Sequence, residues 1–341
     1  MGITLSDKIQ AFSELGKQLN SPAFRTTLDE WAFKAYQTNN WFTETSVFQS
    51  LQNIAKGYLD AERLRTWTNG YRFPQSFSPK RVGLILAGNI PAVGFHDILC
   101  VLMAGHKALI KASSQDFVLI KEIIKQIIEI EPRFAEQIEW TERLNHAEML
   151  IATGSDNSAR YFEYYFRDKP HIIRKNRTSV AVLNGNETAS DFEGLGNDIL
   201  SYYGLGCRNV SKLFVPADYD FTAFYEAIED QGDVFLHHKY KNNYDYNKSI
   251  YLVNQQPHYD NGFLILKPDE TLVSPISVCF YEHYTDQHQL SAQLTAFEPK
   301  IQCIASANAW WPHSVAFGTT QQPNLTDYAD QVDTLKFLLE N

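Results

Sequence analysis

Several features of specialised protein classes are missing from this sequence. There is no internal repeat and no low-complexity tract. Lys and Arg number 30 against 40 Asp and Glu, and the net charge of −10 disfavours nonspecific binding to nucleic acid or to anionic membranes. The most apolar region, residues 82–105, is interrupted by Asn89, Pro91, His96 and Asp97. We therefore expect neither a nucleic-acid partner nor insertion into a membrane.

Cysteine is scarce, and a secretion signal is lacking. The four cysteines, at positions 100, 207, 279 and 303, have neither paired nor metal-ligand spacing. The first residues, MGITLSDKIQAFSELG, show no basic start followed by an apolar stretch. We expect a cytoplasmic protein with free thiols and no metal site, because a reducing compartment is the default without secretion. The usual dinucleotide fingerprint, G-x-G-x-x-G, is also missing.

The sequence has the length and patterning of a two-domain α/β protein. Its 341 residues suffice for two cores, and the first ~75 predict helices because apolar residues recur at helical spacing between Val47 and Leu64. A loop rich in turn residues follows at 69–79. Next, apolar runs predict strands separated by helices, the first helix at about 91–104 and the second capped by Ser113 or Ser114. The predicted strands lie at 82–89, 108–113, 149–155 and 178–185. This alternation indicates a parallel sheet with ligands at the carboxyl ends of its strands.

After residue 187 the pattern is less regular. KLFVP, SIYLV and FLILK predict strands, and HHKYKNNYDYN is an aromatic and polar stretch. We expect a dinucleotide-binding domain at 1–187, to which 306–341 returns, and a catalytic α/β domain at 188–305.

Cys207 is the candidate nucleophile. It lies in GLGCRN, where two glycines permit a close backbone approach and Arg208 would favour the thiolate. The alternative is a buried structural cysteine. Cys100 lies in an apolar helix, and Cys279 and Cys303 lie in apolar strands, so we expect these three in the core.

Candidate ligand-binding residues lie at the carboxyl ends of three of the predicted strands. The Asn89 amide is suited to stabilise an oxyanion, although it also suits a turn or a helix cap. Lys111 can reach a ribose or phosphate, and Ser113 adds a hydroxyl, but a solvated lysine is the alternative. Gly154-Ser155 opens a helix and either binds a pyrophosphate or merely caps that helix.

The adjacent pair His237 and His238 suggests acid-base chemistry or metal binding. Adjacent histidines rarely share one metal, and no carboxylate or cysteine is suitably spaced nearby, so a structural role is the favoured interpretation.

Taken in order, these signals resemble the aldehyde dehydrogenase superfamily. Within it, the chain resembles the fatty acyl reductase family, whose best-known member supplies aldehyde for bacterial bioluminescence. The matching stretches, between about residues 80 and 338, are VGLILAGNIPAVGFHD, ALIKASSQD, ATGSDNSARYF, GLGCRNVSKLFVP and SVAFGTTQQPNLTDYADQVDT. The resemblance implies an aldehyde-dehydrogenase-like α/β fold, with a Rossmann-type dinucleotide-binding domain and a second α/β catalytic domain.

The resemblance also implies roles for particular residues. Cys207 becomes the nucleophile, Asn89 an oxyanion-hole donor, and Phe317 a contact of the acyl chain. The implied cofactor contacts are Ala87, Gly88, Lys111, Ser113, Gly154 and Ser155. The implied cofactor is NADPH, with NADH left open, and we expect a homo-oligomer.

One departure from the superfamily favours reduction. Hydrolytic aldehyde dehydrogenases carry a glutamate, in Glu-Leu-Gly-Gly, that activates water against the acyl-enzyme. The corresponding stretch here, HIIRKNRTSVAVLNG, has no acid between His171 and Asn184. Without this base, an acyl-enzyme would survive to meet hydride. The expected reaction reduces an acyl thioester, on coenzyme A or an acyl-carrier protein, to an aldehyde. The alternatives are an aldehyde oxidoreductase working in the oxidative direction and a catalytically idle binding subunit.

Overall fold

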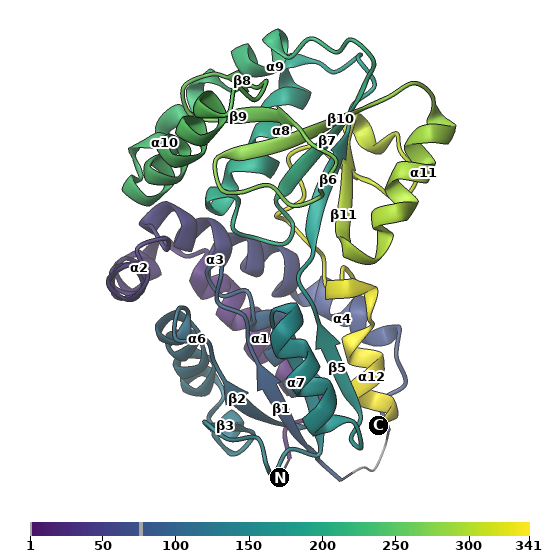
Figure 1. Ribbon diagram of the computed structural model, residues 1–341. Coiled ribbons are helices and arrows are strands. Elements are labelled where there is room, and N and C mark those ends of the chain that lie inside the picture. Colours follow the sequence, from purple (N-terminus) through teal and green to yellow (C-terminus); the bar gives the residue numbers. More distant parts are fainter. Residues whose placement is uncertain (1, 75–77) are drawn as a thin grey trace. The chain divides into compact units, whose positions relative to one another are not determined.

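The chain forms two compact units in the computed structural model, which describes residues 2–74 and 78–341 (Figure 1). Unit 1 comprises Met1–Asn176 and Pro323–Asn341, and unit 2 comprises Arg177–Gln322. These bounds differ from the expected ones at 187/188 and 305/306. The reason is that the strand Thr178–Val182, placed by the sequence in the first domain, pairs with two strands of unit 2.

Unit 1 begins with the expected helices. They are α1 (Leu5–Leu19), α2 (Arg25–Thr38), α3 (Glu44–Tyr58) and α4 (Ala61–Asn69). Side chains cap three of them: Thr4 caps α1, Thr43 caps α3 and Asp60 caps α4, each by accepting a hydrogen bond from a first-turn backbone N–H. Of the loop expected at 69–79, residues 75–77 lie outside the described residues. Within the described ranges, no helix combines the length and the hydropathy needed to cross a bilayer.

A five-stranded parallel sheet forms the centre of unit 1, in the order β3-β2-β1-β4-β5. Three strands match the prediction and two, β3 and β5, were not expected. The strands are β1 (Arg81–Ile85), β2 (Lys107–Lys111), β3 (Ile138–Trp140), β4 (Met149–Thr153) and β5 (His171–Arg174). Helices cover both faces because successive strand residues point to opposite sides. Met149 and Ile151 of β4 join a core that includes residues of α1 and α3, whereas Leu150 and Ala152 pack on the other side of the sheet with Phe162.

Two helix starts in unit 1 differ from the prediction. Helix α5 (Phe95–Ala104) begins four residues after Pro91, because residues 91–94 form a turn. Helix α6 (Phe117–Ile130) has Asp116 at its N-cap, not Ser113 or Ser114. The Ser113 hydroxyl instead accepts a hydrogen bond from the Gln115 N–H, which shapes the turn before the helix. Helix α7 (Asp156–Phe166) follows β4 as expected.

A buried ion pair fastens the end of the chain to unit 1. Arg174, at the end of β5, donates to Asp97 of α5 at 2.6 Å and to Thr334 at 2.9 Å. Thr334 opens the last helix, α12 (Thr334–Glu340). Both charged side chains are at most 10% exposed, so their pairing compensates for the cost of burying each charge.

Unit 2 contains a seven-stranded sheet in the order β12-β11-β6-β7-β10-β9-β8, which is parallel except for the edge pair β8–β9. Its strands are β6 (Thr178–Val182), β7 (Val210–Pro216), β8 (Tyr259–Asp260), β9 (Ile265–Pro268), β10 (Val278–Tyr284), β11 (Ile301–Ser306) and β12 (Val315–Ala316). Its helices are α8 (Ala189–Leu200), α9 (Thr222–Ala227), α10 (His238–Val253) and α11 (Gln287–Phe297). The predictions for KLFVP and, in the main, FLILK are confirmed.

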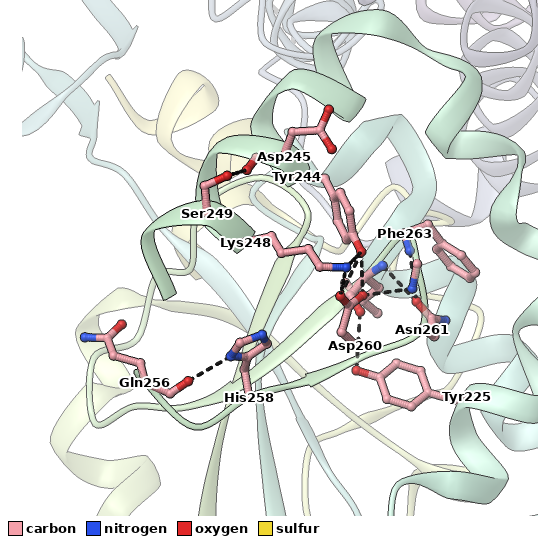
Figure 2. A network of polar contacts seen from close by, with 12 residues as sticks. Tyr225, Tyr244, Asp245, Lys248, Ser249, Gln256, His258, Asp260, Asn261 and Phe263 are labelled. Atoms are coloured by element: carbon pink, nitrogen blue, oxygen red, sulfur yellow. Dashed lines mark hydrogen bonds and ion pairs between the residues drawn. The ribbon is translucent and has the colours of Figure 1, made fainter. Parts of the chain in front are cut away.

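The strand predicted at SIYLV is wrong, because these residues form the last turns of α10. In this segment, tertiary contacts outweigh the strand preference of its β-branched residues. Figure 2 shows Tyr244 and Lys248 of α10 converging on Asp260 of β8. The phenol donates to both carboxylate oxygens, at 2.6 and 2.8 Å, and the ammonium lies 2.6 Å from one of them. These contacts, made one helical turn apart, hold α10 against the sheet edge as a continuous helix.

Candidate active site

Cys207 lies in a turn between a short 3-10 helix, Ser201–Gly204, and β7 in unit 2. The chain reaches this turn through three successive left-handed residues, Tyr202, Tyr203 and Gly204, with φ of 50°, 60° and 77°. Left-handed backbone is costly for the two tyrosines and free for glycine, so the surrounding contacts must hold the conformation.

Asn209 supplies those contacts. Its side-chain oxygen accepts from the Gly206 N–H at 2.8 Å, and its side-chain nitrogen donates to the carbonyls of Asp198 at 3.0 Å and Ser201 at 2.8 Å. Asn209 is buried, and it joins the end of α8 to the turn that presents Cys207. The sequence interpretation gave Asn209 no role; the signal available was an amide two residues after the cysteine.

Ser179 of β6 links the Cys207 turn to a second thiol. Its hydroxyl donates to the Cys207 carbonyl at 3.0 Å, lies 3.0 Å from the Cys303 sulfur and accepts from the Cys303 N–H at 3.2 Å. The sequence predicted that Cys303 lies in the core, but its side chain is half-buried. Burial raises the pKa of the Cys303 thiol, and the positive charge of Arg208 opposes this rise.

The other two cysteines confirm the core expectation. Cys100 of α5 and Cys279 of β10 are fully buried, and burial raises the pKa of both thiols. Cys207, in contrast, is half-buried. Because a nucleophile must be reached by its substrate, Cys207 is the better placed of the three to react.

Phe317 lies in unit 2 with Cys207, although the sequence assigned it to the returning segment of the first domain. The reason is that β12, just before it, pairs with β11 of unit 2. Phe317 is half-buried, and the loop that follows it is bound by Asp198 of α8. Burial raises the pKa of the Asp198 carboxyl to about 6.

The cofactor residues expected from the sequence gather in unit 1. They lie at the carboxyl ends of three adjacent strands: Ala87 and Gly88 follow β1, Lys111 is the last residue of β2 and Ser113 follows it, and Gly154 and Ser155 follow β4. Asn89, the expected oxyanion donor, also follows β1. The turns after β1 and β2 touch, since a Cβ at Gly88 would stand only 2.6 Å from the Ser113 side chain. Lys111 is exposed.

Gly154, at the opening of α7, also permits a close approach that a side chain would block, as Gly88 does between the first two turns. A Cβ at Gly154 would stand 2.9 Å from Ser158 and 3.1 Å from Phe162, so the backbone lies directly on the helix. The Ser155 hydroxyl accepts from the Ser158 N–H at 3.3 Å, which is the capping role weighed for it. A helix N-terminus, a cation and hydroxyls at one sheet edge fit the phosphates of a dinucleotide.

Asp116 is an acid at this edge that the sequence interpretation missed. It is 2% exposed, and burial raises the pKa of its carboxyl well above the usual range. A Cβ at Gly88 would also approach it, to 3.2 Å. Asp116 therefore packs with the turns that follow β1 and β2.

His237 caps a helix, a contact that fits the structural interpretation of the sequence. It caps α10 by accepting from the Tyr240 N–H at 3.4 Å, and its ring stacks with His238 at 5.2 Å. Its ring also meets that of Tyr203 at 4.5 Å. Among residues 2–74 and 78–341, no group of three or more His, Cys, Asp or Glu is arranged to hold a metal ion.

A cavity of about 1020 Å³ lies in unit 1, away from the expected site residues. Its walls include Arg63, Trp67, Tyr71, Asn324 and Lys336, from α4 and the C-terminal segment. Tyr71 belongs to a chain of hydrogen bonds that runs from Trp67 through Tyr328 to Asp333. None of the predicted site residues lines this cavity.

The chain has the fold of the aldehyde dehydrogenases. An oxidoreductase from Marinobacter aquaeolei superposes with a TM-score of 0.66 at 9% identity, covering 91% of this chain and 75% of that one. Aldehyde dehydrogenase C of Pseudomonas syringae, solved as a cysteine-to-alanine variant with NAD+ and octanal, gives a TM-score of 0.63 at 11% identity, covering 89% and 73%. A NAD-dependent benzaldehyde dehydrogenase from Corynebacterium glutamicum also gives 0.63, at 12% identity, covering 89% and 76%.

The sequence resembles a long-chain acyl-protein thioester reductase from Aliivibrio fischeri, with 24% identity over 213 residues. The match covers 56% of this chain and 44% of the relative, which is less than half of the relative's length. No protein-family model matches the chain. The comparisons thus confirm the sequence resemblance to a fatty acyl reductase and an aldehyde-dehydrogenase-like fold.

Proposed function

We propose that this protein reduces the acyl group of a thioester to an aldehyde through a covalent intermediate on Cys207. The observation that carries the proposal is the turn around Cys207. Buried Asn209 and Ser179 hold the turn that presents half-buried Cys207, and the chain enters this turn through the strained left-handed residues Tyr202 and Tyr203. Strain maintained by buried polar contacts is typical of functional sites. The acyl-protein thioester reductase that the chain resembles supports this choice of substrate class.

In the proposed reaction, the Cys207 thiolate attacks the thioester carbonyl, and the Cys207 backbone N–H stabilises the oxyanion. The family resemblance implies that the Asn89 amide is a second donor to this oxyanion. The oxyanion collapses, the carrier thiol leaves, and Cys207 holds the acyl group. A nicotinamide cofactor, NADPH or NADH, would supply the hydride that reduces this acyl group. The bond between sulfur and carbon then breaks, which releases aldehyde and restores the thiolate.

Residues at the sheet edge of unit 1 would hold that cofactor. Lys111 and Ser113 would bind a ribose or phosphate, and Gly154 with Ser155 at the start of α7 would bind the pyrophosphate. The turn at Gly88 would line the adenosine.

The stretch that carries the water-activating glutamate in hydrolytic aldehyde dehydrogenases has no carboxylate here, which would favour reduction over hydrolysis. The stretch from His171 to Asn184 forms β5 and β6 and carries no carboxylate. Both oxygens of Asp198 accept hydrogen bonds from the loop after Phe317. General-base assistance is typically worth about 10²–10⁴-fold, so hydrolysis of the acyl-enzyme should be slow without it.

Intact-protein mass spectrometry with tetradecanoyl-CoA and no nicotinamide tests the proposal. We expect one acyl adduct that hydroxylamine removes and that Cys207→Ala lacks. Cys303→Ser is the matched control, because Cys303 shares Ser179 with the Cys207 turn, and this variant should still be acylated. Addition of NADPH or NADH should then yield aldehyde with loss of nicotinamide absorbance. Rapid steady release of free acid would favour the hydrolytic alternative, and an unreactive Cys207 would favour a binding subunit.

A further inference from the structure

The loop that carries Phe317 is bound to one face of α8. The Asp198 carboxylate accepts from the Gly318 N–H at 2.8 Å, from the Thr320 N–H at 3.1 Å and from the Thr320 hydroxyl at 2.7 Å. Four residues earlier, a Cβ at Gly194 would stand 3.0 Å from the Phe317 carbonyl carbon. Residues four apart share a helix face, so α8 meets the loop at two points one turn apart.

The same end of α8 also holds the turn of the nucleophile. Asn209 donates to the Asp198 carbonyl at 3.0 Å and accepts from the Gly206 N–H at 2.8 Å. Asp198 therefore contacts the Phe317 loop through its side chain and, by way of Asn209, the Cys207 turn through its backbone. Asp198 and Thr320 are at most 1% exposed, so water does not compete for these bonds.

We propose that Asp198 is a positioning residue that fixes the Phe317 loop relative to Cys207 and thereby sets the preference for long acyl chains. The inference rests on the proposed function, because it takes the acyl group on Cys207 to extend past Phe317. A carboxylate suits this task, since its two oxygens satisfy three converging donors. An amide has a single acceptor oxygen and two N–H donors of its own, so an asparagine in this place must lose the bond to Gly318 or those to Thr320. The loop then loses a fixed position, and a chain long enough to touch Phe317 is affected more than an acetyl group.

The experiment compares acylation of Cys207 by acetyl-CoA and by tetradecanoyl-CoA, without nicotinamide, by intact-protein mass spectrometry. We expect Asp198→Asn to lower the ratio of the long-chain to the acetyl second-order rate constant by at least about tenfold. Thr320→Val should lower it by a smaller factor, and Thr320→Ser, which keeps the hydroxyl, should restore it. The matched control is Asp191→Ala, which removes the capping box of the same helix without touching the loop, and which should leave the ratio unchanged.

The possible outcomes distinguish failure of the positioning role of Asp198 from failure of the proposed function. If wild-type Cys207 is acylated but the ratio is unchanged in Asp198→Asn and Thr320→Val, the positioning role is refuted while the proposed function stands. If neither thioester acylates the wild-type protein, the proposed function fails and the inference fails with it. If Asp198→Asn does not fold, the Thr320→Val and Thr320→Ser pair decides the question. A ratio that falls equally in Asp191→Ala would show a general effect of weakening α8, and would also refute the proposal.

Discussion

Replacing Asp198 by asparagine should change how the stability of unit 2 depends on pH. Burial raises the pKa of this carboxyl from the ordinary 3.8 to about 6, against the opposing effect of hydrogen bonds from Thr320 and Gly318. The folded protein therefore keeps the proton of Asp198 at pH values where the unfolded chain has lost it. The stabilisation from this proton is complete below about pH 3.8 and is lost as the pH rises through about 6.

The size of the effect follows from the shift. Each pKa unit corresponds to about 1.4 kcal/mol, so the whole shift is equivalent to about 3 kcal/mol, of which about 2 kcal/mol falls between pH 4.5 and 7. The amide of the Asp198→Asn variant cannot titrate. The free energy of unfolding of the wild type minus that of the variant should therefore fall by about 2 kcal/mol across this range.

Urea unfolding at a series of pH values measures this difference, with Trp310 and Trp311 as fluorescent reporters in unit 2. Other carboxylates titrate in both proteins, so their contributions cancel. In Thr320→Val the loss of a hydroxyl that lowers the pKa of Asp198 should move the transition to higher pH. A difference that rises with pH would refute the reasoning, because it would mean that the three hydrogen bonds outweigh burial and lower the pKa.

Three further predictions concern unit 1. Asn89→Ala should slow acylation of Cys207 by about 10²–10³-fold in rapid-mixing experiments, as expected for loss of one oxyanion donor, and an unchanged rate would remove Asn89 from the mechanism. Arg174→Met leaves the Asp97 charge buried without its partner and should lower the free energy of unfolding by about 3–5 kcal/mol in urea titrations; a loss below about 1 kcal/mol would mean that water reaches the carboxylate. Gly88→Ala forces the first two strand-end turns apart and should weaken NADPH binding, followed by nicotinamide fluorescence, while acylation of Cys207 by tetradecanoyl-CoA persists. Unaltered NADPH binding would exclude the turn from the cofactor site.

The strands of unit 1 could be predicted because their signal is local. A strand such as β4 is buried on both faces and appears as a continuous apolar run, which predicts a strand whatever its partners are. The domain boundary could not be predicted in this way. The run at Thr178–Val182 identifies a strand but not the sheet it joins, and its partners β7 and β11 begin 32 and 123 residues later, at Val210 and Ile301, counted from Thr178. The misassigned end of α10 has the same cause, since Lys248 is held by an aspartate that follows the helix.

Cys207 was accessible to sequence reasoning because the features that make a reactive turn, glycines and a following arginine, are its immediate neighbours. The residues that hold it in place were not. Ser179 reaches the Cys207 carbonyl across 28 residues, and Asp198 reaches Thr320 across 122. From the sequence alone, a serine in an apolar strand is expected to point to the polar side of that strand. An aspartate in an amphipathic helix is likewise expected on the solvent-facing side of the helix. Only their burial shows that another element satisfies their hydrogen bonds, because a buried polar group without a partner costs about 1–3 kcal/mol. Residues that support the Cys207 turn are therefore identified by their burial and by their partners, and Asp198 connects this turn with the loop after Phe317 in this way.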